Sequence, residues 1–289
     1  MRRVSGQLPQ VGNLVFGGDQ AWLLEGEYAV EFGIVTDELS QDPREAVELA
    51  LGWGIRKFEI RGVHGERFPR LSGSGLDDLA ALQSEYGIEY TAVSPGFFKA
   101  HLDDEAHMSY ALGDGLDATV AFMLECSVPL MICFGFEMDT GTDREAVARL
   151  QELADRLAGE GLAGAVENET HCKFNTPERI VALLEAIDRP NLGANWDLGN
   201  LKEGAADGYP AGYELVKPWI RNVHVKDVAL LENGEAEWRP VGEGICDWHG
   251  QIRAIAGDGI AGHVTIESHC GPLDEVGRHN FRVLKEYLA

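Results

Sequence analysis

Four residues that can bind a metal ion stand at or near the end of short apolar stretches. The stretches read Val166-Glu167-Asn168, Trp196-Asp197, Val223-His224-Val225 and Ile266-Glu267. Carboxylates that converge without a cation repel one another strongly. Three carboxylates with one imidazole suit Mn²⁺, Mg²⁺ or Co²⁺ better than a thiolate-bound structural zinc. The sequence therefore predicts one divalent metal, with Mn²⁺ favoured, held by Glu167, Asp197, His224 and Glu267.

Each of these residues also has an ordinary structural interpretation. A lone histidine inside an apolar strand, as His224 is, is more often a satisfied core residue. Asp197 precedes Leu198-Gly199-Asn200, as a turn or capping residue would. Glu167 and Glu267 would be solvated strand ends. Acids at the ends of neighbouring strands favour the metal interpretation for the whole set.

The elements that must position these residues repeat along the chain. Eight short apolar runs each precede a longer amphipathic segment, and several such segments begin with helix-capping residues, as in Asp42-Pro43 and Thr176-Pro177. The expected strands are Val30–Val35, Lys57–Arg61, Glu89–Ser94, Leu130–Phe134, Ala163–Glu167, Leu192–Asp197, Asn222–Lys226 and Val264–Glu267. The pattern predicts an α/β protein with a single (β/α)8 TIM barrel over residues 29–289, where strand ends carry the chemistry. A doubly wound sheet is the alternative, but it lacks the glycine-rich dinucleotide fingerprint. Residues 1–28 are expected to form an N-terminal extension.

The composition excludes several classes of partner. The 289 residues include 48 acidic and 24 basic side chains, a net charge of −24, which argues against nucleic-acid binding. No apolar run is long enough to cross a membrane, so no membrane partner is expected. The five cysteines form no CxxC pair, and the N-terminus has no signal-peptide pattern. We expect a cytoplasmic protein.

Several motifs together resemble one family. They are Phe58-Glu59-Ile60-Arg61, Val166-Glu167-Asn168, Asp197-Leu198-Gly199-Asn200, His224-Val225-Lys226-Asp227, Val241-Gly242-Glu243-Gly244 and Ile266-Glu267. With its motifs in this order, the chain resembles the xylose-isomerase-like TIM barrels, also described as the sugar phosphate isomerase/epimerase superfamily. The resemblance extends from about Val30 to the end of the chain. The resemblance implies that the four predicted ligands bind one divalent metal and that Glu167 and Glu267 move protons. It also implies a homo-oligomer.

One position departs from the ketose epimerases of that superfamily. Those enzymes carry a histidine three residues after the strand-six aspartate, where it contacts the substrate. Asn200 occupies this position here. The departure argues against a simple ketose 3-epimerase, and Asn200 is a candidate substrate contact in its place.

Further polar residues lie close to the predicted strand ends. Lys226 shares its strand face with His224, so we expect it to stabilise an oxyanion; a salt bridge to a rim acid is the alternative. Arg61 is a candidate for binding a substrate carboxylate or phosphate, or else pairs with Glu59 or another rim acid. His171 and His269 either contact substrate hydroxyls or have surface and packing roles.

These observations predict a metal-dependent isomerase or epimerase that acts on a small sugar or keto-sugar. A proton leaves the carbon next to a carbonyl, an ene-diolate forms, and Glu167 and Glu267 act as acid and base. The alternative is a metal-dependent lyase or dehydratase that acts by β-elimination on a keto-sugar, inosose or 3-keto-glycoside. An endonuclease IV-like DNA repair enzyme would need basic grooves and more histidines. A non-catalytic sugar-binding barrel would not need two opposed glutamates.

Overall fold

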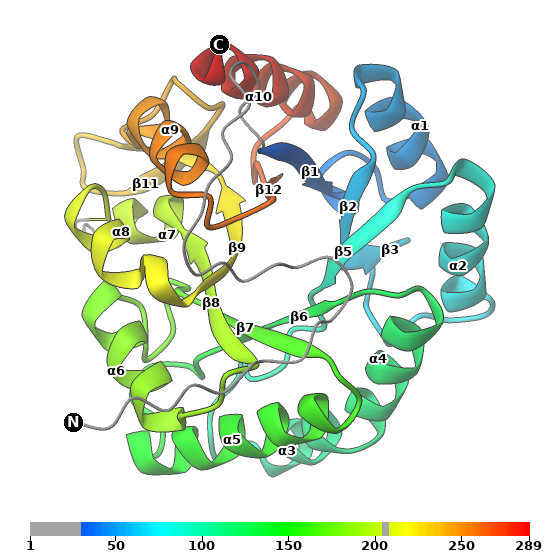
Figure 1. The fold of residues 1–289 in the computed structure, drawn as a ribbon, viewed down its shortest axis with the longest axis vertical. Coiled ribbons are helices and arrows are strands. Elements are labelled where there is room, and N and C mark those ends of the chain that lie inside the picture. Colours follow the sequence, from blue (N-terminus) through cyan, green and yellow to red (C-terminus); the bar gives the residue numbers. More distant parts are fainter. Residues whose placement is uncertain (1–29, 204–207) are drawn as a thin grey trace.

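Eight short strands pair in parallel and close into a barrel, and helices cover its outside (Figure 1). The computed structural model describes residues 30–203 and 208–289. The barrel strands are β1 (Glu31–Val35), β2 (Lys57–Ile60), β5 (Glu89–Val93), β6 (Leu130–Phe134), β7 (Ala163–Glu167), β8 (Leu192–Asp197), β9 (Ile220–Val225) and β12 (His263–Ile266). Their order around the barrel is β1-β12-β9-β8-β7-β6-β5-β2. The predicted (β/α)8 barrel is confirmed, and each expected strand agrees with an observed one to within two residues.

The helices lie between the strands in the chain. They are α1 (Pro43–Trp53), α2 (Gly75–Tyr86), α3 (Glu105–Leu112), α4 (Asp114–Glu125), α5 (Asp143–Gly159), α6 (Pro177–Ile187), α7 (Leu198–Glu203), α8 (Ala211–Val216), α9 (Trp248–Asp258) and α10 (Leu273–Leu288). Asp42 caps α1 and Thr176 caps α6, as their sequences predict. No helix in the described ranges has the length and apolar character to cross a membrane. The predicted extension, residues 1–28, lies outside the described residues, so the boundary at residue 29 stays a prediction.

The barrel interior has an apolar layer and a polar layer. Ala92, Leu130, Ile132 and Ala165 form a small buried cluster of their own. Because side chains alternate along a strand, Ala165 and Glu167 face the same side, so this cluster lies below the strand ends. The larger apolar core includes outward-facing strand residues such as Val166 and packs them against the helices. Glu167 thus lies above this apolar cluster, at the carboxyl-terminal mouth of the barrel.

Two short hairpins extend the mouth beyond the strands. One consists of β3 (Gly62–Val63) and β4 (Glu66–Arg67), directly after β2. The other consists of β10 (Asp227–Leu230) and β11 (Ala236–Arg239), directly after β9. A 3-10 turn, η1 (Thr36–Glu38), follows β1, and a second, η2 (Lys217–Trp219), precedes β9. These elements bring side chains to the mouth that the barrel strands alone do not supply.

Asp227 holds the loop that contains the Val241-Gly242-Glu243-Gly244 motif. Its Oδ2 accepts hydrogen bonds from the backbone N–H of Gly242 (2.9 Å) and Gly244 (3.2 Å). Its Oδ1 accepts one from Cys246 N–H (3.0 Å) and one from Val228 N–H (2.9 Å). A Cβ on Gly244 would lie 2.2 Å from Asp227 Oδ1, so only glycine fits there. The described contacts therefore give this motif a structural role.

We expect Asp227→Ala to lower the free energy of unfolding by about 2–4 kcal/mol, because buried backbone donors would lose a charged acceptor. Urea denaturation followed by circular dichroism measures the change. Glu243→Ala, at an exposed position of the same loop, is the matched control and should change stability by less than about 0.5 kcal/mol. Equal stabilities of the two variants would contradict this role for Asp227.

Candidate active site

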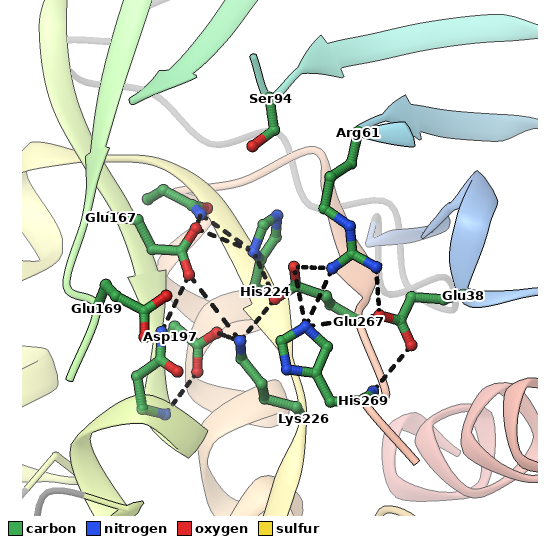
Figure 2. A network of polar contacts seen from close by, with 12 residues as sticks. Glu38, Arg61, Ser94, Glu167, Glu169, Asp197, His224, Lys226, Glu267 and His269 are labelled. Atoms are coloured by element: carbon green, nitrogen blue, oxygen red, sulfur yellow. Dashed lines mark hydrogen bonds and ion pairs between the residues drawn. The ribbon is translucent and has the colours of Figure 1, made fainter. Parts of the chain in front are cut away.

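The four predicted ligands gather at the carboxyl-terminal mouth of the barrel (Figure 2). One ligand atom from each of Glu167, Asp197, His224 and Glu267 lies within 4.8 Å of the other three. The strand register explains this, because Asp197 pairs with His224 across β8 and β9 and Thr265 pairs with His224 across β9 and β12. All four side chains are buried. We refer to these four residues as the acid–histidine cluster.

Glu59 on β2 orients the imidazole of His224. Its Oε2 lies 2.7 Å from His224 Nε2, and its Oε1 accepts a hydrogen bond from Asn222 Nδ2 at 2.7 Å. His224 Nδ1 therefore faces the cluster, 3.2 Å from Glu267 Oε2 and 3.1 Å from Asn195 Nδ2. A carboxylate behind a histidine fixes the ring and its tautomer for metal binding. Glu59 therefore contacts His224 and Asn222, whereas Arg61 pairs with other acids of the rim.

Lys226 projects its ammonium group into the cluster. Its Nζ lies 3.0 Å from Asp197 Oδ2 and 2.7 Å from Glu267 Oε2, and the side chain is buried. Neither oxygen has a hydrogen-bond partner among the described residues, so only the nearby charge of Lys226 and, for Glu267, the ring of His224 offset its burial. Buried carboxylate oxygens without a hydrogen bond are costly. The cluster thus combines an oxygen-rich donor set with unsatisfied oxygens, and its residues fit a divalent metal.

The two glutamates of the cluster differ in basicity. Burial and the neighbouring carboxylate of Glu267 raise the pKa of Glu167 to about 7. Burial also acts to raise the pKa of Glu267, but the charges of Lys226, His224 and His269 outweigh it and hold that pKa well below its ordinary value. Paired carboxyl groups whose pKa values are pushed apart can divide the roles of proton acceptor and proton donor.

Asn200 makes its contacts inside the protein. Its Nδ2 donates to Glu167 Oε1 at 3.0 Å, and its backbone N–H donates to Asp197 Oδ1 at 2.9 Å. From the other side, Asn195 Nδ2 donates to Glu167 Oε2 at 3.0 Å. Two asparagine amides thus hold the Glu167 carboxylate in place. The predicted contact between Asn200 and substrate stays a prediction.

Arg61 is surrounded by acidic partners. Its Nε lies 3.0 Å from Asp37 Oδ2, its Nη2 lies 2.7 Å from Glu38 Oε1, and its Nη1 lies 2.8 Å from Glu267 Oε1. Of the two interpretations of Arg61, the pairing with rim acids therefore matches the observed contacts. A guanidinium with all three nitrogens engaged has little capacity left for an anionic ligand. These contacts place Arg61 beside Glu267, and its predicted contact with a substrate anion stays a prediction.

The two predicted substrate histidines occupy different settings. His269 is exposed at the mouth, where its Nε2 lies 3.0 Å from Arg61 Nη1 and its ring meets Trp238 edge-to-face at 5.5 Å. A hollow of about 470 Å³ opens beside these two rings. His171 is exposed, and its ring contacts no described side chain of the cluster. The structure brings His269 to the site and leaves His171 outside it.

Sequence reasoning missed several residues of the site. Glu59, Asn195 and Asn222 are polar positions within apolar strand runs, and this could have marked them. Trp238 lies on β11 with its ring centre 5.3 Å from Lys226 Nζ, and its hairpin carries no comparable signal. Trp238 reaches the mouth only through the geometry of its hairpin.

With the fold and cluster described, comparison with known proteins is informative. The model of the xylose isomerase-like TIM barrel family matches residues 47–287. The chain belongs to the xylose isomerase-like TIM barrel family. A search of curated proteins finds no match.

Three solved structures illustrate the likeness within this family's fold. The probable 3-DHS dehydratase AsbF from Bacillus anthracis has a TM-score of 0.73 at 16% identity, with 89% of this chain and 99% of that chain covered. The IOLI protein with a bound zinc atom has a TM-score of 0.73 at 17% identity, covering 90% and 98%. The D-allulose 3-epimerase from Methylomonas sp., in complex with D-allulose, has a TM-score of 0.71 at 15% identity, covering 89% and 97%. At these identities the likeness concerns the fold.

We expect Glu59→Gln to weaken binding of Mn²⁺ by about 10- to 100-fold, because the ring of His224 would lose its charged partner. Isothermal titration calorimetry on the folded variant measures the change. Glu89→Gln is the control, since Glu89 is exposed and begins β5 at the opposite end of the barrel. Unchanged affinity in a folded Glu59→Gln protein would show that Glu59 does not position His224.

Proposed function

We propose that this protein is a divalent-metal-dependent isomerase or epimerase that acts on a small sugar or keto-sugar. The observation that carries the proposal is the acid–histidine cluster, in which two buried glutamates with opposite pKa shifts face one point. Mere binding of a sugar does not need two such carboxylates. The metal-bound and epimerase structures of similar fold support the same class of reaction.

The proposed chemistry divides between the metal and the side chains. A divalent cation held by Glu167, Asp197, His224 Nδ1 and Glu267 would supply a Lewis acid for neighbouring oxygens of the substrate. Glu167 and Glu267 exchange the proton on the carbon next to the carbonyl. The ammonium of Lys226 stabilises negative charge that develops on a substrate oxygen. Asn195 and Asn200 keep Glu167 aimed at the reacting carbon.

A second candidate is β-elimination on the same scaffold, giving a lyase or dehydratase. Asn200 favours it, because this side chain holds Glu167 where the ketose epimerases carry a substrate-binding histidine. The similar fold of the probable dehydratase from Bacillus anthracis supports it too. Both reactions begin with the same proton abstraction. The metal identity, a cytoplasmic location and a homo-oligomer remain predictions from the sequence.

We expect the purified protein to hold about one divalent metal per chain, and His224→Ala to lose most of it. Elemental analysis of both proteins, purified in parallel and after soaking in Mn²⁺, measures this. His249→Ala, at an exposed position of α9, is the control and should retain the metal. A wild-type protein without metal after soaking would refute the proposed mechanism.

We expect Glu167→Gln and Glu267→Gln each to lower turnover by about 100-fold or more, because each removes a proton-transfer group. A panel of keto-sugars in deuterated water measures the reaction. Deuterium uptake without loss of water identifies an isomerase or epimerase, whereas loss of water identifies the dehydratase. Glu243→Gln is the control and should keep wild-type turnover. Full activity in either cluster variant would remove that residue from the mechanism.

A further inference from the structure

Arg67 carries a positive charge at the mouth without a carboxylate partner. It lies on β4 opposite Gly62, and its Nη2 donates a hydrogen bond to Ser94 Oγ at 3.0 Å. No acidic side chain in the described part of the chain pairs with its guanidinium. Since a guanidinium has five N–H donors, most of its donors remain available.

The other cations named at this mouth are already neutralised. Arg61 holds Asp37, Glu38 and Glu267. Lys226 holds Asp197 and Glu267. Lys99 pairs with Glu169 at 2.5 Å. Of Arg61, Lys226, Lys99 and Arg67, therefore, Arg67 is the one without an acidic partner among the described residues.

Ser94 supplies a second donor beside Arg67. It follows β5, is buried, and its backbone N–H donates to Ile60 O at 2.8 Å. Its Oγ accepts the hydrogen bond from Arg67, and no described residue accepts the hydroxyl hydrogen. Figure 2 shows the hydroxyl pointing from the end of β5 toward the cluster. Arg67 and Ser94 thus present two adjacent donor groups.

The loop after β5 fixes the place of the guanidinium. Gly96 has a φ of +77°, and a Cβ there would lie 3.3 Å from Arg67 Nε and 3.5 Å from its Cζ. The guanidinium therefore rests directly against the backbone of this loop. It also lies close enough to Asp37, Glu267 and Glu167 for their charges to act on its pKa, which burial and Arg61 lower. The guanidinium is thus partly desolvated near the cluster, although Arg67 as a whole residue is exposed.

We propose that Arg67 and Ser94 bind a carboxylate of the substrate, so that the substrate is an acidic sugar derivative instead of a neutral sugar. A planar carboxylate with one negative charge matches one guanidinium and one hydroxyl. A phosphate carries nearly two negative charges, and among the described ion pairs Arg67 alone of Arg61, Lys99, Lys226 and Arg67 would be left to balance them. The inference rests on the proposed function, because the cluster fixes where the reacting carbon lies.

The test compares three probes that share one carbon chain: D-fructose, D-fructuronate and D-fructose 6-phosphate. Binding to the Mn²⁺-soaked full-length protein is measured by isothermal titration calorimetry. D-Fructuronate is expected to bind at least tenfold more tightly than either of the other two. If D-fructuronate binds no more tightly than D-fructose, the inference is overturned. If D-fructose 6-phosphate binds most tightly of the three, the inference is also overturned, and the ligand of Arg67 is a phosphate.

Variants then assign the preference to Arg67. Arg67→Met should abolish the preference for D-fructuronate without changing the affinity for D-fructose, and Arg67→Lys should retain part of it. Arg70→Met is the matched control, because Arg70 carries the same charge three residues further on and stacks on Tyr110 at 3.6 Å. A preference that survives in folded Arg67→Met, or that falls equally in Arg70→Met, overturns the assignment.

The metal content of the same samples separates this inference from the proposed function. Arg67→Met should keep the wild-type metal content, because Arg67 contacts none of the four cluster residues. If the metal is present and deuterium uptake is observed but the carboxylate preference is not, the subsite alone is refuted. If the preference is present in a protein that binds no metal, the proposed function is refuted and the subsite stands.

Discussion

The mouth of this barrel depends on balancing negative charge in a buried space. Glu167, Asp197 and Glu267 converge from three strands, and their mutual repulsion would be severe without positive charge nearby. Arg61 and Lys226 supply that charge from the rim and from the end of β9. Because each cation contacts more than one acid, the positions of the carboxylates are linked. A change in one contact therefore affects the basicity of the others.

A layer of polar residues beneath the cluster fixes the orientation of the cluster's side chains. Glu59, Asn195 and Asn222 point inward from their strands and bond to His224, to Glu167 and to one another. Burying polar groups costs free energy unless they are paired, and most of the atoms in this layer are. The small apolar cluster below closes the barrel. The rigid part of the site is thus built from strands, whereas hairpins and loops supply its variable wall.

The sequence predicts the four residues at the strand ends well, but not the polar strand residues beneath them or the residues on loops. A strand has a fixed side-chain alternation and a register set by its neighbours, so an acid at the end of an apolar run has a predictable direction. This holds for Glu167, Asp197, His224 and Glu267, which lie together as expected. Arg61, Asn200 and His171 lie beyond strand ends, where partners depend on how loops fold. No periodicity in the sequence indicates that η1 delivers Asp37 and Glu38 to Arg61, or that Asn200 turns back to Glu167.

A chain with a net charge of −24 would at first sight repel an acidic substrate. Salt screens charges beyond roughly 8 Å at physiological ionic strength, so the distant surface contributes little at the mouth. The local balance decides, and there the acids are paired with Arg61, Lys226 and Lys99 while Arg67 is not. A carboxylate at Arg67 would complete the pairing, whereas a neutral sugar would leave a cation uncompensated beside the cluster. The proposed metal at the cluster and the proposed carboxylate at Arg67 would thus balance the charges of the mouth at two separate points.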